Sequence, residues 1–321
     1  MMPRDGLRFL VVIPHRNGQD LLEATVRSAL AACTPLDKVV VVDNASSDGS
    51  ATAVAELFPE MRLIRNARNR GFAGACNQGA SSEDSRYLLF LNSDAQIPPN
   101  TLDEVALHMQ RQPGLGQLGL QLVSGDGRRQ RSSMMQPSFW TELGLRKRVP
   151  KWYRDPVSTA PVESLVGACV AMPTHVFRTV GGWNEAFFFY EEDLDLSRRV
   201  REAGFEVLLR PDLMAVHARG ASTAGVRLPA QLEALRSRFT FIRLHFSGFA
   251  WLLIAARVAS VGMNALGAAL VLLGTLGLQP RSRTRAWRLF VTVIWLLLLM
   301  RPNWGLSRWS DKGLAASGDR S

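Results

Sequence analysis

Two acidic segments of this 321-residue chain have the residue types and the surroundings that chemistry requires. The triplet Asn92-Ser93-Asp94 directly follows five apolar residues at 87–91, and Glu191-Glu192-Asp193-Leu194-Asp195 follows four aromatic residues at 187–190. A carboxylate just beyond a buried strand can hold a hard cation that bridges phosphates. Four carboxylates within five residues raise at least one pKa, and a raised carboxylate is a usable general base. Either segment could instead be a turn or a helix start, which favour the same residue types.

Polar loops also follow three other apolar runs, at 9–13, 39–42 and 61–64. Runs of this length are typical of strands buried on both faces, and they alternate with helical patterns, which predicts right-handed βαβ units and a parallel sheet. Loops that follow parallel strands open at the same edge of the sheet. We therefore expect Asp43, Asp48, Arg70 and Asp94 to converge there, although any one of them alone could be a helix cap or a solvated charge.

The rest of the pattern extends this architecture. Helices are predicted near 20–30, 75–80 and 102–110, and from Glu192 to Ala203, where Gly204 stops the helix. Further strands are predicted at 118–123, 165–172, 207–209 and 215–217. Residues 124–160 contain a hairpin turn at 125–127 and are either a mobile active-site loop or a disordered insertion. His217 ends the last strand and is either a metal ligand or a structural histidine.

Composition and charge exclude several classes of protein. The three cysteines are far apart, form neither a disulfide framework nor a zinc pattern, and suit a reducing compartment. The apolar run at 9–13 is too short for the core of a signal peptide, so we expect the catalytic part to stay in the cytoplasm. The net charge of +10 lies in the tail, where twelve Lys or Arg from Arg236 onward face only two Asp. Nucleic-acid binding is one interpretation of such a tail, but arginines among long apolar runs favour an anionic membrane surface.

The tail contains an uncharged run at 258–280 that is long enough to span a bilayer, at about 20 residues, and a shorter apolar run at 289–300 that is not. A single span at 258–278 would leave arginines on both sides, which the positive-inside rule disfavours. We therefore predict helices that lie in the interface, or dip into the membrane and return, and a peripheral or monotopic protein on the cytoplasmic face of a membrane, which the resemblance given below implies is a bacterial inner membrane. The alternative is a soluble cytoplasmic protein in which the tail forms a buried helical subdomain or a contact in a homo-oligomer.

Taken in order, the polar segments resemble family 2 of the glycosyltransferases, which has the GT-A fold, over roughly residues 8–225. The matching segments are Val12-Ile13-Pro14 with Asn17, Val42-Asp43-Asn44-Ala45-Ser46-Ser47-Asp48-Gly49, Asn69-Arg70-Gly71-Phe72-Ala73-Gly74 with Asn77, Asn92-Ser93-Asp94, and Glu192-Asp193-Leu194-Asp195-Leu196 with Arg199. Each segment is weak alone, but five in order are specific. The chain is most similar to the bacterial rhamnosyltransferase-like group. This implies an α/β GT-A catalytic domain at 1–225, with a Rossmann-like, mostly parallel central sheet flanked by helices, and a helical membrane-associating region at 226–321.

The resemblance also implies roles for individual residues. Asp193 matches the catalytic base, with Glu192 beside it, and Asp94 with His217 matches a site for a divalent cation, Mg²⁺ or Mn²⁺. Asp43 matches a contact to the nucleotide base. The positions implied in nucleotide-sugar binding are Pro14, Asn17, Asp43, Asp48, Asn69, Arg70, Asn77, Asn92 and Ser93.

Three departures from the family pattern bear on metal strength and acceptor choice. Asn92 replaces the first carboxylate of the usual Asp-x-Asp, Asn184 stands where relatives often have Asp, and Arg219 stands where small residues or His are common.

The function implied is inverting transfer of a sugar, with rhamnose from dTDP-rhamnose as the first choice, to a hydroxyl of a glycan or a lipid-linked acceptor in cell-envelope polysaccharide synthesis. The alternatives are a UDP- or GDP-hexose donor, a nucleotidyltransferase, or an inactive membrane-binding module.

Overall fold

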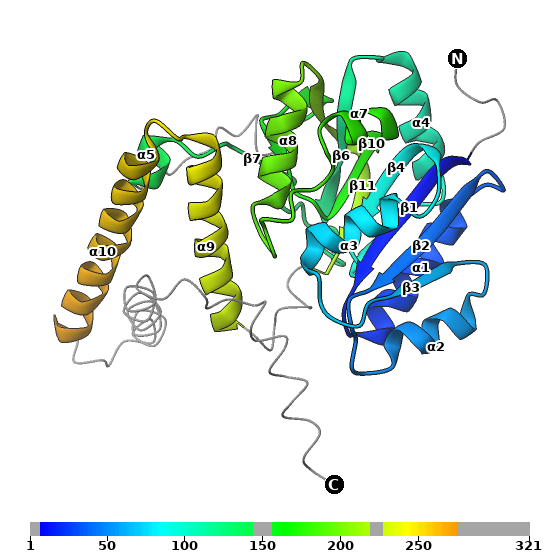
Figure 1. The fold of residues 1–321 in the computed structure, drawn as a ribbon, viewed down its shortest axis with the longest axis horizontal. Coiled ribbons are helices and arrows are strands. Elements are labelled where there is room, and N and C mark those ends of the chain that lie inside the picture. The colour runs from blue at the N-terminus through cyan, green and yellow to red at the C-terminus, as the bar shows by residue number, and fades with distance from the viewer. Residues whose placement is uncertain (1–6, 144–155, 219–226, 275–321) are drawn as a thin grey trace, which may run out of the picture.

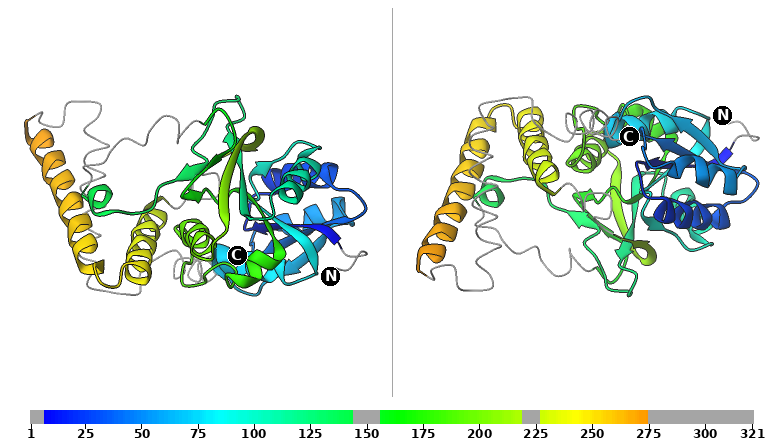
Figure 2. Two further views of the ribbon diagram at one scale, coloured as in Figure 1. Left: turned by 90° about the horizontal axis from the view of Figure 1, so that it is seen from above. Right: turned by 90° about the horizontal axis from the view of Figure 1, so that it is seen from below.

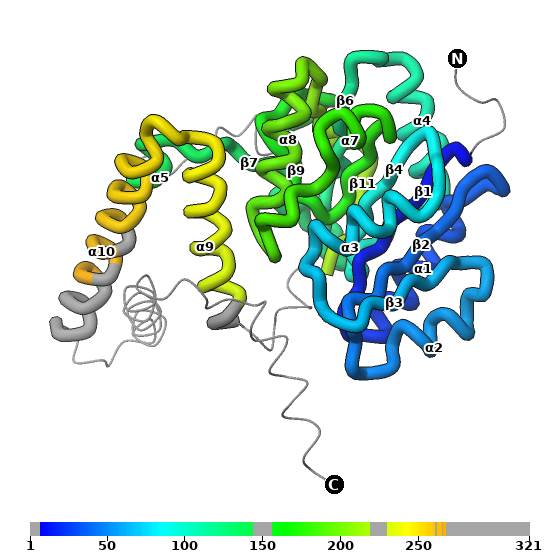
Figure 3. The backbone as a smooth tube through the Cα atoms, viewed as in Figure 1, coloured from blue at the N-terminus to red at the C-terminus, as the bar shows by residue number. Residues whose placement is uncertain are grey.

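The computed structural model describes residues 7–143, 156–218 and 227–274. A sheet with the strand order β3-β2-β1-β4-β10-β6-β11-β5 runs through the catalytic part, with β8 paired to β11. Helices cover both faces of this sheet, and α9 and α10 extend to one side of it (Figure 1). The tube trace shows the same separation between the sheet and these two helices (Figure 3).

The first half of the sheet is the predicted set of parallel βαβ units. β1 pairs in parallel with both β2 and β4, and β2 pairs in parallel with β3. The elements are β1 (Leu7–His15), α1 (Gln19–Ala32), β2 (Asp37–Asp43), α2 (Ser50–Leu57), β3 (Arg62–Arg65), α3 (Gly71–Ala80) and β4 (Ser85–Leu91).

Strand β1 explains why these apolar runs have no polar face. Phe9, Val11 and Ile13 enter the core on one side of the sheet, whereas Leu10 and Val12 enter the core on the other side. Both faces are buried because helices pack on each, so every position of the run is apolar. Helix α3 approaches closely at Gly79, where a Cβ would lie 2.4 Å from the Val12 side chain.

The second half of the sheet is mixed rather than parallel. β10 (Cys169–Pro173) runs antiparallel to β4 and to β6 (Leu115–Val123). β11 (Glu206–His217) runs parallel to β6 and antiparallel to β5 (Ala95–Gln96) and β8 (Ala160–Pro161). The expectation of a parallel sheet is therefore correct for β1 to β4, and the whole sheet is the mostly parallel sheet of the GT-A class.

Two strand predictions were wrong in their bounds. The run 165–172 is interrupted by a turn, so that β9 (Ser164–Leu165) pairs with β7 (Ser133–Met134) in a small second sheet, apart from β10. The runs 207–209 and 215–217 are one strand, β11, because an irregular register between Arg210 and Met214 accommodates the polar residues between them. The predicted hairpin turn is confirmed, since Gly127 N–H donates to the Ser124 carbonyl.

Helices α4 (Thr101–Arg111), α7 (Thr174–Thr179) and α8 (Glu192–Glu202) complete the catalytic part. The short α5 (Phe139–Glu142) leaves the sheet and packs against α10 (Ala250–Gly274), which also contacts α9 (Arg227–His245) (Figure 2). None of the helices within the described ranges is both long and apolar enough to cross a membrane. The apolar run 289–300 lies outside the described residues.

Candidate active site

The predicted metal residues Asp94 and His217 meet, although they are far apart in the sequence. Asp94 follows β4 and directly precedes β5, whose antiparallel pairing places Ala95 opposite His217 at the end of β11. A backbone hydrogen bond from Ala218 N–H to the Asp94 carbonyl closes this corner. His217 Nε2 lies 3.4 Å from Asp94 Oδ1, and both side chains are buried. Asn92 and Ser93 are half-buried beside this pair.

One carboxylate oxygen and one imidazole nitrogen are a suitable pair of donors for a divalent cation. Within the described ranges there is no group of three or more His, Cys, Asp or Glu side chains that could hold a metal. A cation at this corner would therefore need further ligands from a bound substrate or from water, as sites for phosphate-bound cations commonly do. Asn92 in place of a carboxylate is consistent with this sparse donor set.

The predicted base Asp193 lies in the first turn of α8. Its Oδ2 accepts a hydrogen bond from Gly167 N–H at 3.1 Å, and its Oδ1 accepts one from Leu194 N–H at 2.9 Å. Burial nevertheless raises the pKa of Asp193 to about 6, against the lowering effect of those two backbone donors. A carboxylate with this pKa is ionised at neutral pH and basic enough to accept a proton.

A short backbone path connects the predicted base, Asp193, to the predicted metal residues. Asp193 binds Gly167 N–H, and the next residue, Ala168, accepts a hydrogen bond from Asn92 N–H at 2.9 Å. The 167–168 turn that divides β9 from β10 therefore fixes Asp193 relative to the Asn92-Ser93-Asp94 triplet. A Cβ at Gly167 would lie 3.3 Å from the Asp193 Cβ, so the glycine makes room for this close approach.

Glu192 differs from its neighbour Asp193 in its hydrogen bonding. Its side chain is buried and its Oε2 has no hydrogen-bond partner. Burial, with the nearby Asp193 carboxylate, raises the pKa of Glu192 well above its ordinary value. Of the two carboxylates, only Asp193 makes hydrogen bonds to the 167–168 turn that leads to Asn92.

The chain enters α8 through a strained turn. Tyr190 and Glu191 both have positive φ angles, 71° and 69°, which non-glycine residues rarely adopt. Glu191 pairs with Arg238 of α9 at 3.2 Å, and burial raises the pKa of Glu191 to about 7. Ser237 of α9 donates to the Phe189 carbonyl. Consecutive strained residues persist where their surroundings hold them, and here α9 supplies the contacts.

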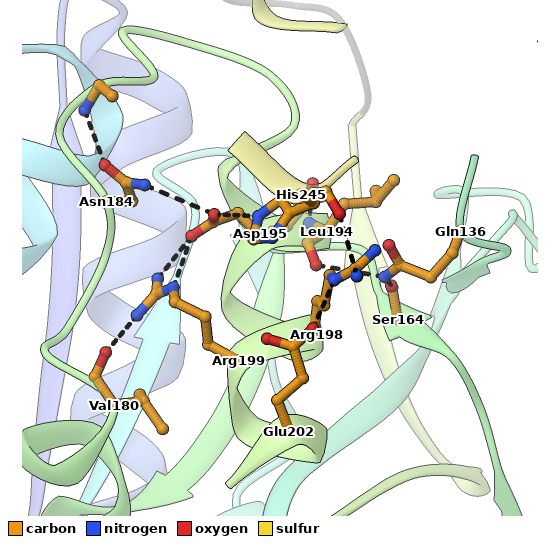
Figure 4. A network of polar contacts seen from close by, with 12 residues as sticks. Gln136, Ser164, Val180, Asn184, Leu194, Asp195, Arg198, Arg199, Glu202 and His245 are labelled. Atoms are coloured by element: carbon orange, nitrogen blue, oxygen red, sulfur yellow. Dashed lines mark hydrogen bonds and ion pairs between the residues drawn. The ribbon is translucent and has the colours of Figure 1, made fainter. Parts of the chain in front are cut away.

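The last carboxylate of the acidic segment, Asp195, is structural. It is completely buried and accepts hydrogen bonds from Arg199 on α8 and from His245 on α9, the latter at 2.7 Å (Figure 4). Burial opposes ionisation, but the hydrogen bond from His245 and the Arg199 charge lower the pKa of Asp195. Asn184 also donates to Asp195, at 3.4 Å, so an amide at position 184 avoids a second carboxylate facing this one.

Helix α9 is thus part of the catalytic unit as well as the start of the C-terminal region. Phe241 is completely buried against Phe187 and Leu194. Sequence reasoning missed His245, Arg238 and Phe241 because nothing in a helical pattern shows which surface the helix covers. It also missed Gln130, whose side chain contacts His217.

The predicted nucleotide residues of the first two loops hold those loops together. Asp48 accepts a hydrogen bond from Gly18 N–H, and Asn17 accepts one from Ser47 N–H. Asp43 is buried at the end of β2 and accepts from Ser46 N–H. Pro14 is buried within β1, level with Val42. These contacts join the loops after β1 and β2 at the predicted edge of the sheet.

The third loop borders a cleft of about 550 Å³ lined by residues 66–70, Glu185 and Phe188. Arg70 reaches to 3.8 Å from Glu185 across it. Phe72 N–H donates to the Phe188 carbonyl, and Gly71 permits this approach, since a Cβ there would lie 2.5 Å from that oxygen.

Asn69 and Asn77 are engaged within the protein. Asn69 accepts from Gly71 N–H, while Asn77 donates to Glu185 and exchanges two hydrogen bonds with the Trp183 backbone. The structure therefore gives Asn77 a role in positioning residues 183–185. The loop after β3 is in this way joined to the aromatic segment that leads to Asp193.

Comparison with known proteins agrees with this geometry. The sequence model of glycosyl transferase family 2 matches residues 10–166. N-acetylglucosaminyl-diphospho-decaprenol L-rhamnosyltransferase of Mycobacterium tuberculosis is 28% identical over 307 residues, which cover 87% of this chain and 96% of that protein. An O-antigen biosynthesis protein of Myxococcus xanthus is 27% identical over 68% of this chain but only 18% of its own length.

The fold is shared with a solved mannosyltransferase from Pyrobaculum calidifontis in complex with GDP-Man and Mn²⁺. That structure has a TM-score of 0.56 and 20% sequence identity, and the match covers 94% of this chain and 89% of that chain. The chain therefore has the GT-A fold, and its residues 10–166 match the model of glycosyl transferase family 2.

Proposed function

We propose that this protein is a metal-dependent, inverting glycosyltransferase that moves a sugar from a nucleotide donor to a hydroxyl of a lipid-linked acceptor. The observation that carries the proposal is the fixed relation between Asp193 and the Asp94–His217 pair through the 167–168 turn. A base and a cation site held on one rigid backbone path are what a single displacement requires.

The chemistry follows from these two parts. Asp193 accepts the proton of the acceptor hydroxyl, the hydroxyl oxygen attacks the anomeric carbon, and the bond from that carbon to the diphosphate breaks. A divalent cation, Mg²⁺ or Mn²⁺, would be held by Asp94 and His217 and would stabilise the negative charge of the leaving diphosphate. With one base and no enzyme nucleophile, the attack comes from the face opposite the leaving group, so the anomeric configuration inverts.

The nucleotide is proposed to occupy the edge formed by the loops after β1, β2 and β3. Asp43, near the joined Asn17 and Asp48 loops, recognises the base, and Arg70 at the adjoining cleft offers a guanidinium to the diphosphate. The first donor to test is dTDP-rhamnose, because the Mycobacterium tuberculosis relative is named as a rhamnosyltransferase and matches along nearly its whole length. The same name supports a lipid-linked diphosphosugar as the acceptor class and cell-envelope polysaccharide as the product.

We further propose that the protein works at an anionic membrane surface. Helix α10 and the loop before it expose Phe249, Trp251, Met263 and Leu266, and the neighbouring α5 exposes Trp140. Large aromatic and aliphatic side chains next to an arginine-rich tail suit the headgroup region of such a membrane. This surface lies on α5 and α10. Helix α9 contacts α10 and also pairs with the acidic segment through Arg238 and His245.

A panel of nucleotide-sugars, assayed for transfer to a polyprenyl-diphosphosugar with and without EDTA, tests the proposal. We expect transfer from dTDP-rhamnose that EDTA abolishes and that Mn²⁺ or Mg²⁺ restores, with inversion at the anomeric carbon by NMR. Transfer only from UDP- or GDP-hexoses would overturn the donor assignment. Full turnover in EDTA would overturn the metal assignment.

A further inference from the structure

The side chain of Gln130 contacts His217 through two hydrogen bonds. Its Nε2 donates to the His217 backbone carbonyl at 2.7 Å, and its Oε1 lies 3.2 Å from His217 Nδ1. Gln130 follows the 124–128 hairpin, whereas His217 ends β11, so the contact spans 87 residues of sequence. One side chain thereby fixes both the backbone and the imidazole ring of a proposed metal ligand.

The backbone carbonyl determines which way the Gln130 amide faces. A carbonyl oxygen can only accept, so the group 2.7 Å from it must be the NH₂ end of the amide. The Oε1 end therefore faces the imidazole. The usual ambiguity of an amide side chain does not arise here, because one of its two partners can accept only.

The amide in turn determines the tautomer of the imidazole. Oε1 can only accept, so Nδ1 must carry the proton that joins them. In the neutral ring, Nε2 then presents its lone pair, and it does so 3.4 Å from Asp94 Oδ1. Two electron-pair donors facing each other at this distance repel unless a positive charge lies between them, which is the arrangement that a bound cation satisfies.

Gln130 is itself held firmly. Its N–H donates to the Leu122 carbonyl at 2.8 Å, and its own carbonyl accepts from the side chain of Gln121, which is fully buried. Ser132 Oγ also donates to the Gln130 carbonyl, at 3.1 Å. The residue is therefore anchored to β6 before its side chain reaches His217.

From these contacts we propose that Gln130 is a positioning residue that sets the tautomer and orientation of His217 so that Nε2 is available to a divalent cation beside Asp94. The metal part of this inference rests on the proposed function, whereas the tautomer part does not. Outer partners of metal-binding histidines act in this way, and their loss weakens metal affinity by about 10- to 100-fold.

The test compares the wild-type protein with Gln130→Met, which has similar volume but neither hydrogen-bonding end. Gln110→Met, at an exposed position of α4, is the matched control. Two quantities are measured for each full-length protein: the ¹⁵N chemical shifts of the His217 ring in metal-free protein, assigned with His217→Asn, and the Mn²⁺ affinity by EPR titration in the presence of dTDP.

We expect the proton on Nδ1 in the wild type and in the control. In Gln130→Met, we expect a shift toward a proton on Nε2 and Mn²⁺ binding about 10- to 100-fold weaker. A wild-type ring with its proton on Nε2 would overturn the inference even if the variant failed to fold. Unchanged Mn²⁺ affinity in Gln130→Met would also overturn it. A wild type that binds no Mn²⁺ would instead refute the proposed metal site, while the tautomer measurement would still decide the role of Gln130.

Discussion

Replacement of Asp193 by Asn is expected to separate activity from stability. Both oxygens of Asp193 accept backbone N–H groups, from Gly167 and Leu194. Asparagine keeps the shape and one of these acceptors, but it cannot take a proton from an acceptor hydroxyl. The substitution therefore removes the proposed base while leaving the turn at 167–168 largely in place.

The expected loss of turnover is about 10²- to 10⁴-fold, the usual contribution of a general base. This corresponds to about 3 to 5 kcal/mol of transition-state stabilisation, at about 1.36 kcal/mol per decade. Since the pKa of Asp193 is about 6, the wild-type rate should also fall tenfold per pH unit below pH 6 and level off above it.

The free energy of unfolding should change with pH in the direction opposite to the rate. The pKa of Asp193 is raised from 3.8 to about 6, so between these values the folded protein holds a proton that the unfolded chain has released. The free energy of unfolding therefore falls as pH rises through this window, by up to about 3 kcal/mol, and the penalty is fully present above pH 6. The Asp193→Asn variant carries no such penalty, although it loses one hydrogen bond worth about 1 kcal/mol. Relative to wild type, the variant should gain stability between pH 4 and pH 8.

Steady-state transfer kinetics and urea unfolding at pH 4, 6 and 8 measure these effects. Asp84→Asn is the surface control, because that side chain is 90% exposed. Glu192→Gln is the second control, and with Asp193 as the base it should keep turnover within a few-fold, since glutamine keeps the size and shape of the Glu192 side chain. Near-normal turnover in Asp193→Asn, together with loss of turnover in Glu192→Gln, would refute the assignment of the base.

Three further changes test other parts of the structure. Asp94→Ala should weaken Mn²⁺-dependent binding of the nucleoside diphosphate by at least about tenfold in calorimetry without changing the fold, and unchanged binding would contradict the cation site. His245→Ala should lower the free energy of unfolding by about 1.5 to 3 kcal/mol in urea titration, because it removes one hydrogen bond from the buried Asp195 carboxylate, which keeps its contacts to Arg199 and Asn184, whereas Glu202→Gln on the exposed side of α8 should cost less than about 1 kcal/mol. Trp251→Glu should abolish flotation with vesicles that contain anionic lipids while transfer to a water-soluble acceptor is retained, and flotation equal to wild type would contradict the proposed membrane surface.

Prediction from sequence succeeded where burial alone determines the local pattern of residues. The apolar runs of β1, β2 and β4 are buried on both faces, so their positions follow from composition alone. Prediction failed at the 167–168 turn, where the apolar pattern continues but the pairing partner changes, and at β11, where polar residues interrupt the pattern but the strand keeps its partner β6 across an irregular register. The strand that is β10 was predicted but its antiparallel direction was missed, since a buried strand has the same composition in either direction.

The sequence by itself determined the class of fold and the edge of the sheet at which the loops meet, and its resemblance to a known family pointed to Asp94, His217 and Asp193 as candidate site residues. Only the tertiary structure showed how the neighbouring carboxylates of 191–195 differ in hydrogen bonding, with Asp193 on Gly167 N–H and Asp195 on Arg199 and His245. It also decided that α9 braces the acidic segment and that Gln130 holds His217. These contacts join residues that are tens of positions apart, and their partners are set by the packing of whole elements, which no local spacing encodes.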